Sequence, residues 1–370
     1  MKKKICWVTS DCFVDVDFNI EILSFILEIY DIDWYILFPV EKSKFINFDF
    51  SEIQNLEGIR IFKIISTYKS GDLRRLTMYI QLYKDIKNST PDIIYINSPV
   101  SPYILLLVYM LEKRKIILTT HEGFIHSGFN NQKIRRIMRS MIFNHASFIN
   151  LFSISQSKIF LEHNKSKTIY TIPLCLKSFG SVDLEKRNDT IVFLIFGNIC
   201  YEKNIELLIK AACNIYEKGI RGFKISINGM CDNWDYYLKE IKYPQIFEND
   251  IRLIDNKEIP KLFSECHYLV QPYRIVSQSG PLKIAFNYNL PVICSNLPGF
   301  SDEVISNVNG FLFESCNVNS LEDVLIECIK KNPLDYIQLI EKMKIYTKKK
   351  YSNFSLSQMY LNMFNDLLKL

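Results

Sequence analysis

Short runs of β-branched and aromatic residues alternate with helix-like patterns along almost the whole chain. The first series of strand-like runs is ICWVTS, DWYILFP, IRIFKII, DIIYIN, KIILTT, FINLFSIS and TIYTIP. The second series is TIVFLIFG, FKISING, IRLID, YLVQPY, PVICS and GFLF. Strands that alternate with helices predict parallel sheets covered by helices on both faces. Two such series predict two doubly wound α/β domains.

A polar, charged segment separates the two series and predicts a hinge at 178–189, SFGSVDLEKRND. We therefore expect one domain at 1–177 and a second at 190–350. Helices are expected at roughly 333–350 and 354–369, because apolar residues recur there at three- and four-residue spacing. The segment 351–370 follows the second domain as a separate terminal helix.

The composition favours a soluble enzyme. Of 370 residues, 48% are hydrophobic and only twelve are glycine, which argues against a disordered or fibrous chain. Ten cysteines include no C-x-x-C pair, so we expect buried thiols in a reducing compartment and no zinc site. The apolar run after MKKK is too short for a signal peptide. YILLLVYML is far below the ~20 residues that span a bilayer, so a cytoplasmic location is expected.

The segment from Gln271 to Glu303 combines a strand, a helix start and a second strand. Ser279 is the expected N-cap, and Pro281 suits the first helical position because it lacks an N–H. The N–H groups of Gly280 and Leu282 would then be unpaired at a helix start, which suits a phosphate or diphosphate. The same elements also occur in doubly wound proteins that bind only water there.

The order PY-x4-QSG-x4-A-x5-PVI-x-S-x2-PG-x2-(D/E) resembles the donor-site segment of retaining GT-B glycosyltransferases of family four. The resemblance implies two Rossmann-like, doubly wound parallel-sheet domains that face a cleft. The domain at 1–177 would bind the acceptor, and 190–350 would bind the nucleotide sugar. The helix in 351–370 would pack back on the N-terminal domain. The match covers nearly all of the second domain and, in the first, only the region around TTHE.

Donor residues follow from the same resemblance. FGNICYEKN is similar to the family's G-R/N-x4-K-G motif, which implies that Lys203 stabilises the departing diphosphate and that Gly197 and Asn198 line the site. An isolated lysine at this position would otherwise be a solvated charge. The remaining donor-binding candidates are Gln278, Ser279, Gly280, Leu282 and Lys283.

The chain departs from the family at several positions. Val276 and Ile284 stand where many members have two glutamates, so no carboxylate is assigned to the ribose. Lys283 and Arg274 flank the QSG turn, either as donor-site cations or as solvated surface charges. The acidic residue after the family's G-G-x-x sequence matches Asp302 or Glu303, which could equally be an N-cap.

In the first domain, His121 directly follows the strand KIILTT, where doubly wound folds bind ligands. The family has a T-x-H-D-like segment here, which implies that His121 approaches the donor sugar and acts in catalysis; a structural histidine is the alternative. His126, Asp11 and Asp15 are expected acceptor contacts, and Asp17 is expected to cap the following helix. The GT-B resemblance implies that no metal ion is needed.

Basic residues cluster in QKIRRIMRSMIF, where Lys133, Arg135, Arg136 and Arg139 form one edge of a helix. Its apolar side contains Ile134, Ile137, Met138, Met141 and Ile142. Together with the basic stretch Leu73–Lys87, this pattern suits an anionic membrane surface or, more simply, solvated charge. No nucleic-acid-binding motif is present.

The resemblance implies a metal-independent retaining glycosyltransferase that moves a hexose from a UDP- or GDP-sugar to a glycan or lipid-linked acceptor. The resemblance places such enzymes in capsule, lipopolysaccharide or glycolipid synthesis, peripheral to the cytoplasmic membrane. Two alternatives stay open. A sugar-nucleotide epimerase would need carboxylates around the sugar, which the donor segment lacks, and a noncatalytic GT-B subunit would bind sugar nucleotide or glycan without turnover.

Overall fold

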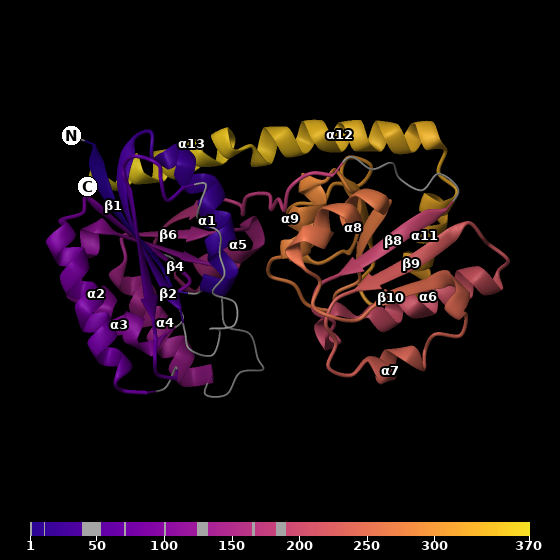
Figure 1. The fold of residues 1–370 in the computed structure, drawn as a ribbon, viewed down its shortest axis with the longest axis horizontal. Helices are drawn as coiled ribbons and strands as arrows, with labels where there is room; N and C mark the ends of the chain where they lie inside the picture. The colour runs from indigo at the N-terminus through magenta and orange to yellow at the C-terminus, as the bar shows by residue number, and fades with distance from the viewer. Residues whose placement is uncertain are drawn as a thin grey trace. The chain divides into compact units, whose positions relative to one another are not determined.

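The structure is a computed structural model that describes residues 2–10, 12–38, 53–69, 72–99, 101–123, 132–164, 167–182 and 190–370. The chain divides into two compact units. Unit 1 consists of Met1–Cys175 together with Tyr351–Leu370, and unit 2 consists of Leu176–Lys350. The two units are coloured from indigo to yellow along the chain in Figure 1.

Unit 1 contains a parallel sheet of seven strands in the order β3-β2-β1-β4-β5-β6-β7. This is a doubly wound arrangement, in which the strand order reverses between β1 and β4. The strands are β1 Lys3–Thr9, β2 Tyr30–Phe38, β3 Ile59–Ile65, β4 Ile93–Asn97, β5 Ile116–Thr120, β6 Phe148–Leu151 and β7 Thr168–Thr171. The predicted first series of strands is confirmed.

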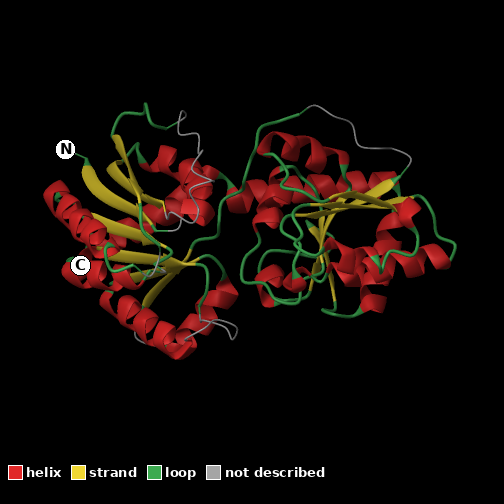
Figure 2. Ribbon diagram, turned by 60° about the horizontal axis from the view of Figure 1, so that its bottom comes forward, coloured by secondary structure: helices red, strands yellow, loops and turns green. Residues whose placement is uncertain are grey.

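Helices cover both faces of this sheet (Figure 2). Alternate residues of one strand enter different cores: Trp7 packs with α1 and α13, whereas Val8 lies in the core that contains α2 and α3. The helices are α1 Cys12–Ile26, α2 Arg75–Ser89, α3 Pro102–Met110, α4 Gln132–His145, α5 Ile154–His163 and α13 Asn353–Leu367.

The terminal helix α13 is part of the unit 1 core. Tyr360 and Phe364 pack against Trp7, with ring centres 5.9 and 6.4 Å from it. Burial of each such side chain stabilises the unit by about 1.5–3 kcal/mol. Two hydrogen bonds also fix the orientation of α13 on the sheet: Tyr30 Oη donates to Asn365 at 3.2 Å, and Tyr170 Oη donates to Asp366 at 2.7 Å. The expected return of the last helix to the N-terminal domain is confirmed.

Unit 2 has a six-stranded parallel sheet in the order β10-β9-β8-β11-β12-β13. Its strands are β8 Ile191–Phe196, β9 Phe223–Asn228, β10 Phe247–Asp250, β11 Tyr268–Gln271, β12 Val292–Ser295 and β13 Gly310–Phe313. Its helices are α6 Ile205–Glu217, α7 Trp234–Leu238, α8 Ile259–Glu265, α9 Gly280–Asn287, α10 Pro298–Ser301, α11 Val318–Ile329 and α12 Pro333–Tyr351.

One predicted strand is wrong. IRLID at 251–255 was expected in the sheet, but β10 is the preceding segment, Phe247–Asp250, which pairs with β9 from Ile225 to Asn228. Ile246 and Phe247 are buried and anchor this edge strand, while the rest of β10 is only partly covered. Packing of the two anchors therefore outweighs the low strand propensity of Glu, Asn and Asp.

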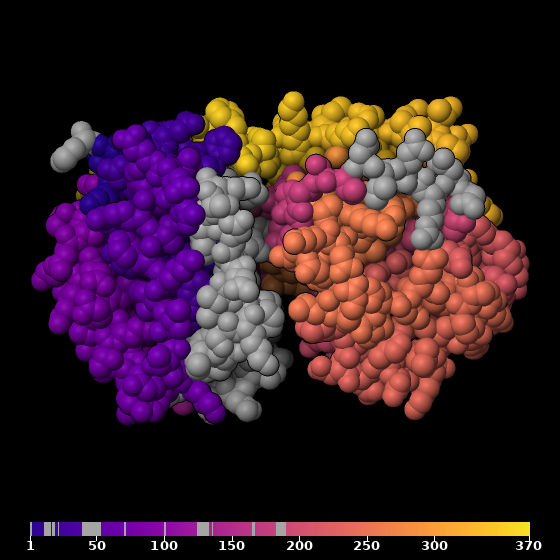
Figure 3. Space-filling model, in the orientation of Figure 1, coloured from indigo at the N-terminus to yellow at the C-terminus, as the bar shows by residue number. Residues whose placement is uncertain are grey.

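The long helix α12 follows α11 and forms part of the molecular surface in Figure 3, where it is yellow. Its inner side is tied to unit 2, because Tyr346 Oη donates to the Glu303 carbonyl at 3.0 Å and Lys350 Nζ donates to the Asp302 carbonyl at 3.1 Å. None of the helices in the described ranges is long and apolar enough to cross a membrane.

Candidate donor site

The strand order of unit 2 brings two distant loops to one edge of the sheet. β8 pairs with β9 on one side and with β11 on the other, so the order reverses at β8. Ligands of doubly wound folds bind where the carboxyl ends of strands diverge at such a point. The loop after β8 begins at Gly197, and the loop after β11 leads to Ser279.

Gly197 lies close to the start of α9. Its φ of +109° is a left-handed conformation, and a Cβ atom at this position would lie 3.7 Å from Pro281 Cγ. On its other side, Gly229 approaches so closely that a Cβ there would lie 1.9 Å from the Gly197 carbonyl oxygen. These glycines let the FGN loop lie against the helix start, although about 80 residues separate the two motifs.

Ser279 caps α9 as the sequence predicts, because its Oγ accepts a hydrogen bond from the Leu282 N–H at 3.3 Å. The expectation that the Leu282 N–H is unpaired is therefore wrong: the cap uses it. Ser279 is held in turn by Gln271, whose Nε2 donates to Ser279 Oγ at 2.8 Å. Around Gly280, no atom lies within 4 Å of a Cβ position, so a ligand can approach this backbone.

Lys203 lies beside an aromatic ring at the same edge. It ends the short turn Tyr201–Lys203 after β8, and its Nζ is 3.7 Å from the centre of the Tyr273 ring, two residues after β11. This distance is within the range of a cation–π contact. Within the described ranges Lys203 forms no ion pair, so its charge is available to an anion.

Arg274 holds the Lys203 turn in place. Its backbone N–H donates to the Glu202 carbonyl at 2.9 Å, and its guanidinium donates to the Tyr201 carbonyl at 2.6 Å and to Glu206 at 2.6 Å. The ion pair with Glu206 shows that Arg274 is not a solvated surface charge. It links the loop after β11 to α6, which fixes Lys203 relative to Tyr273.

Two further donor candidates lie in these loops. Asn198 is exposed after Gly197. The side-chain Oε1 and Nε2 of Gln278 are both buried, and no other residue that the structure describes forms a hydrogen bond with them. Because a buried amide without a partner costs stability, Gln278 is suited to a ligand that supplies the missing bonds.

Lys283 differs from its expected state. It is fully buried, and its Nζ is paired with the buried carboxylate of Glu303. The interpretation as a solvated charge is therefore wrong, and the pair neutralises the extra cation that Lys283 was expected to add to the donor site. Nor does either acidic residue cap a helix N-terminus: Asp302 is the C-cap of α10, and Glu303 binds Lys283.

His121 lies in unit 1 at the carboxyl end of β5, and its ring centre is 4.6 Å from that of Phe152, just after β6. Arg139 of α4 reaches the same strand end, where its Nη2 donates to Thr120 Oγ1 at 3.1 Å and Nη1 lies 3.9 Å from Glu122. Burial lowers the pKa of Arg139 to about 10. Its assignment to an exposed basic edge is therefore wrong.

The expected acceptor residues mostly fall outside what the structure describes. Asp11 and His126 lie in undescribed segments, and for Asp15 only the backbone, within α1, is described. α1 begins at Cys12, so Asp17 is inside the helix and is not its N-cap. Among the described residues, no group of three or more His, Cys, Asp or Glu side chains is arranged to hold a metal ion.

Comparison with known proteins identifies the second unit. Residues 179–350 match the model of a family described as "Glycosyl transferases group 1". This segment is a group 1 glycosyltransferase domain. The resemblance inferred from the QSG segment is confirmed for this part of the chain, and the whole chain has the GT-B fold. No curated protein matches the sequence.

Solved structures share the fold over almost the whole length of this chain. A glycosyltransferase from Rickettsia africae ESF-5 has a TM-score of 0.77 at 13% identity, covering 100% of this chain and 99% of the other. Alr3699/HepE from Anabaena, in complex with UDP and glucose, has a TM-score of 0.73 at 13% identity, covering 98% of this chain and 100% of the other. The lipopolysaccharide outer core galactosyltransferase WaaB has a TM-score of 0.64 at 16% identity, covering 96% of this chain and 99% of the other.

Several contacts in this candidate donor site were not predicted from the sequence. Tyr273 belongs to the matched PY dipeptide, but only the fold shows that Lys203 stacks on it. Gly229 follows the strand FKISIN and carries no motif of its own. The partner of Lys283, Glu303, is twenty residues away, and no local pattern predicts that pairing.

Proposed function

We propose that this protein is a retaining glycosyltransferase that transfers a hexose from a nucleotide diphosphate sugar to a glycan or lipid-linked acceptor. One observation carries the proposal: Gly197, Lys203 and the capped start of α9 meet at the strand-order reversal of unit 2. This arrangement combines an unpaired ammonium, a helix N-terminus and backbone free of side chains. Those are the groups that recognise a diphosphate.

We propose a UDP-sugar as the donor, with a GDP-sugar as the second candidate. HepE, which shares the fold, binds UDP and UDP-glucose. Gln278, with both amide atoms unpartnered, is the candidate to bind the nucleotide or sugar beside the diphosphate. The catalytic step needs no metal ion in this proposal, because Lys203 and the α9 dipole supply positive potential.

In the proposed step, the bond between the anomeric carbon and the diphosphate oxygen breaks while Lys203 stabilises the growing negative charge. The acceptor hydroxyl attacks from the same face, and its proton passes to the departing diphosphate oxygen, so the anomeric configuration is retained. The protein contributes by orientation and charge stabilisation rather than by a covalent nucleophile. His121 is proposed to approach the donor sugar, as the family resemblance implies, with its ring packed beside Phe152.

The N-terminal unit is proposed to bind the acceptor through Asp11, Asp15 and His126. A membrane-bound acceptor is supported by α4, where Ile134, Ile137 and Met141 are exposed at three- and four-residue spacing. An exposed apolar stripe on a helix that also exposes Lys133 suits an anionic membrane surface. WaaB, a galactosyltransferase of the lipopolysaccharide outer core, shares the fold, and we propose surface polysaccharide or glycolipid synthesis as the pathway.

The test is sugar transfer from a panel of radiolabelled UDP- and GDP-hexoses to acceptors in a bacterial membrane fraction, with and without EDTA. The proposal predicts incorporation from one donor, unaffected by EDTA, and NMR of the product should show the anomeric configuration of the donor. Inverted configuration contradicts the retaining mechanism. Tight donor binding without transfer would indicate the noncatalytic subunit, and interconversion of free sugar nucleotides would indicate the epimerase.

A further inference from the structure

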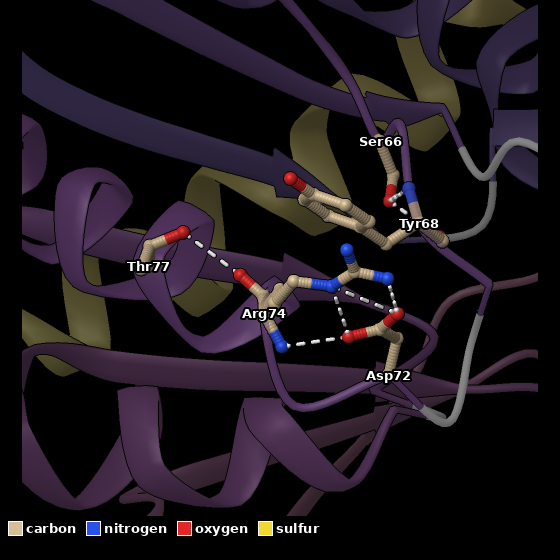
Figure 4. Close-up of polar contacts among 5 residues, drawn as sticks. All are labelled: Ser66, Tyr68, Asp72, Arg74 and Thr77. Atoms are coloured by element: carbon tan, nitrogen blue, oxygen red, sulfur yellow. Dashed lines mark hydrogen bonds and ion pairs between the residues drawn. The ribbon is translucent and has the colours of Figure 1, made fainter.

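Unit 1 contains a cavity of its own, whereas the donor motifs belong to unit 2. It has a volume of about 290 Å³ and lies where β3 ends and α2 begins. Its lining includes Ser66, Tyr68, Arg74, Arg75, Thr77 and Gln81. Figure 4 shows five residues of this region, among them Tyr68, Asp72 and Arg74.

Arg75 is the unusual residue of this cavity. It is 5% exposed and its Nε is buried without a hydrogen-bond partner, and the described part of the chain provides no carboxylate in an ion pair with it. A buried cation that is neither paired nor hydrogen-bonded is strongly unfavourable. The basic stretch Leu73–Lys87 is therefore not one solvated surface, because its second arginine points into the protein.

The acidic residue nearest to Arg75 in sequence is already neutralised. Asp72 accepts hydrogen bonds from the backbone N–H of Arg74 at 2.9 Å and from its Nη2 at 2.6 Å (Figure 4). The Arg74 guanidinium also stacks on the Tyr68 ring, 4.1 Å from its centre. The hydrogen bonds from Arg74 lower the pKa of Asp72 to about 2, so Asp72 stays charged and paired with Arg74 rather than with Arg75. Among the described residues of the cavity, no acidic side chain compensates the charge of Arg75.

Besides the apolar side chains of Ile65 and Met78, the lining includes hydroxyl groups that suit a sugar joined to the anion. Ser66 Oγ donates to the Tyr68 carbonyl at 2.8 Å, and Thr77 Oγ1 donates to the Arg74 carbonyl at 2.8 Å, which leaves their second lone pairs as acceptors. The first turn of α2 contains no acidic residue, and its dipole adds positive potential.

We propose that this cavity is an oxyanion subsite in which Arg75 binds a phosphate group of the acceptor. The phosphate belongs either to a soluble sugar phosphate or to the headgroup of a membrane lipid, since a guanidinium binds both through the same paired hydrogen bonds. Only the assignment of the anion to the acceptor rests on the proposed function; the anion site itself does not.

The test compares the wild type with Arg75→Met, Arg75→Lys and the matched control Lys84→Met, which removes an exposed charge from the same helix. Inorganic phosphate and glucose 1-phosphate are titrated at low millimolar concentration, with ³¹P NMR line broadening and thermal shift as readouts. We expect Arg75→Met to weaken phosphate binding at least tenfold and Lys84→Met to leave it within twofold. Arg75→Lys retains the positive charge but loses the planar guanidinium that donates two parallel hydrogen bonds, and it should weaken binding about threefold.

The melting temperature separates an anion-binding arginine from a merely structural one. If Arg75 binds an anion, Arg75→Met without phosphate should melt at or above the wild-type temperature, because it removes an unpaired buried charge without leaving a cavity. A fall of several degrees together with an unchanged phosphate response would overturn the proposal. If Arg75→Met does not fold, equal phosphate binding by Arg75→Lys and the wild type overturns it instead.

Vesicles distinguish the two sources of phosphate. Cosedimentation with phosphatidylglycerol vesicles that depends on Arg75, without binding of soluble phosphates, assigns the site to a lipid headgroup. Binding of soluble phosphates assigns it to a sugar phosphate. If neither depends on Arg75, the proposal is wrong. UDP binding by unit 2 should be equal in the wild type and Arg75→Met, so failure of this inference and failure of the proposed function are told apart.

Discussion

The Nζ atom of Lys203 lies 3.7 Å from the centre of the Tyr273 ring. The two residues follow neighbouring strands, β8 and β11, and Arg274 fixes the turn between them through Tyr201, Glu202 and Glu206. An ammonium held over an aromatic ring keeps its charge and loses little flexibility when an anion binds. The relationship therefore supports Lys203 as a pre-positioned diphosphate ligand.

Lys203→Ala should lower transfer by at least tenfold with little change in melting temperature, because the residue is part-exposed and its loss removes charge stabilisation. The matched control is Lys210→Ala, which removes an exposed lysine from α6. Steady-state kinetics with the identified donor provide the measurement. Equal turnover by wild type and Lys203→Ala would remove Lys203 from the site.

Two glycine substitutions should separate binding from folding. Gly280→Ala meets no atom within 4 Å, so stability should change by less than about 0.5 kcal/mol, while its methyl group obstructs the diphosphate and weakens donor binding about tenfold. Gly229→Ala places a Cβ 1.9 Å from the Gly197 carbonyl at a φ of +144° and should cost about 2–4 kcal/mol.

Gly219→Ala is the control for backbone strain alone, because Gly219 has a φ of +81° and open space around its Cβ position. Its cost should be about 1–2 kcal/mol. Urea denaturation gives the three stabilities, and calorimetry gives donor affinity. Normal donor affinity in Gly280→Ala would contradict the placement of the diphosphate at the start of α9.

The buried pair of Lys283 and Glu303 should be strongly coupled. Glu303→Leu leaves a buried ammonium without its carboxylate and should cost about 3–5 kcal/mol, whereas the double variant Lys283→Met/Glu303→Leu should recover most of that loss. A double-mutant cycle in urea measures the coupling. If the separate losses of Glu303→Leu and Lys283→Met simply add in the double variant, the pair does not interact as the structure indicates.

Thiol reactivity at pH 8 should be confined largely to Cys316 among the described cysteines, because it is the exposed one. Burial raises the pKa of Cys6 and of Cys328 to about 12, so almost none of either thiol is ionised until the pH approaches that value. Iodoacetamide labelling followed by mass spectrometry tests this. Labelling of Cys6 as fast as Cys316 in the native protein is the contradicting result, and urea-unfolded protein provides full labelling as the reference.

Much of the fold follows from local sequence, since strand runs, helix periodicity and the Ser279 cap depend on neighbouring residues. β10 was misplaced because the burial of Ile246 and Phe247 decides an edge strand against the propensities of Glu248 and Asn249. Lys283 was misjudged for a similar reason: its partner Glu303 is distant in sequence, and only the tertiary fold brings the two side chains together. The burial of Arg75 could not be predicted, because the sequence does not distinguish a buried arginine from the exposed Arg74 beside it.

The central claim is that unit 2 binds a nucleoside diphosphate through Lys203 and the start of α9. Isothermal titration of wild type, Lys203→Ala and Lys210→Ala with UDP and GDP, each in EDTA, tests it most directly. The account predicts saturable binding of one nucleotide by the wild type and by Lys210→Ala, and at least tenfold weaker binding by Lys203→Ala. Binding of neither nucleotide to the wild type, or equal affinity in all three proteins, would contradict it.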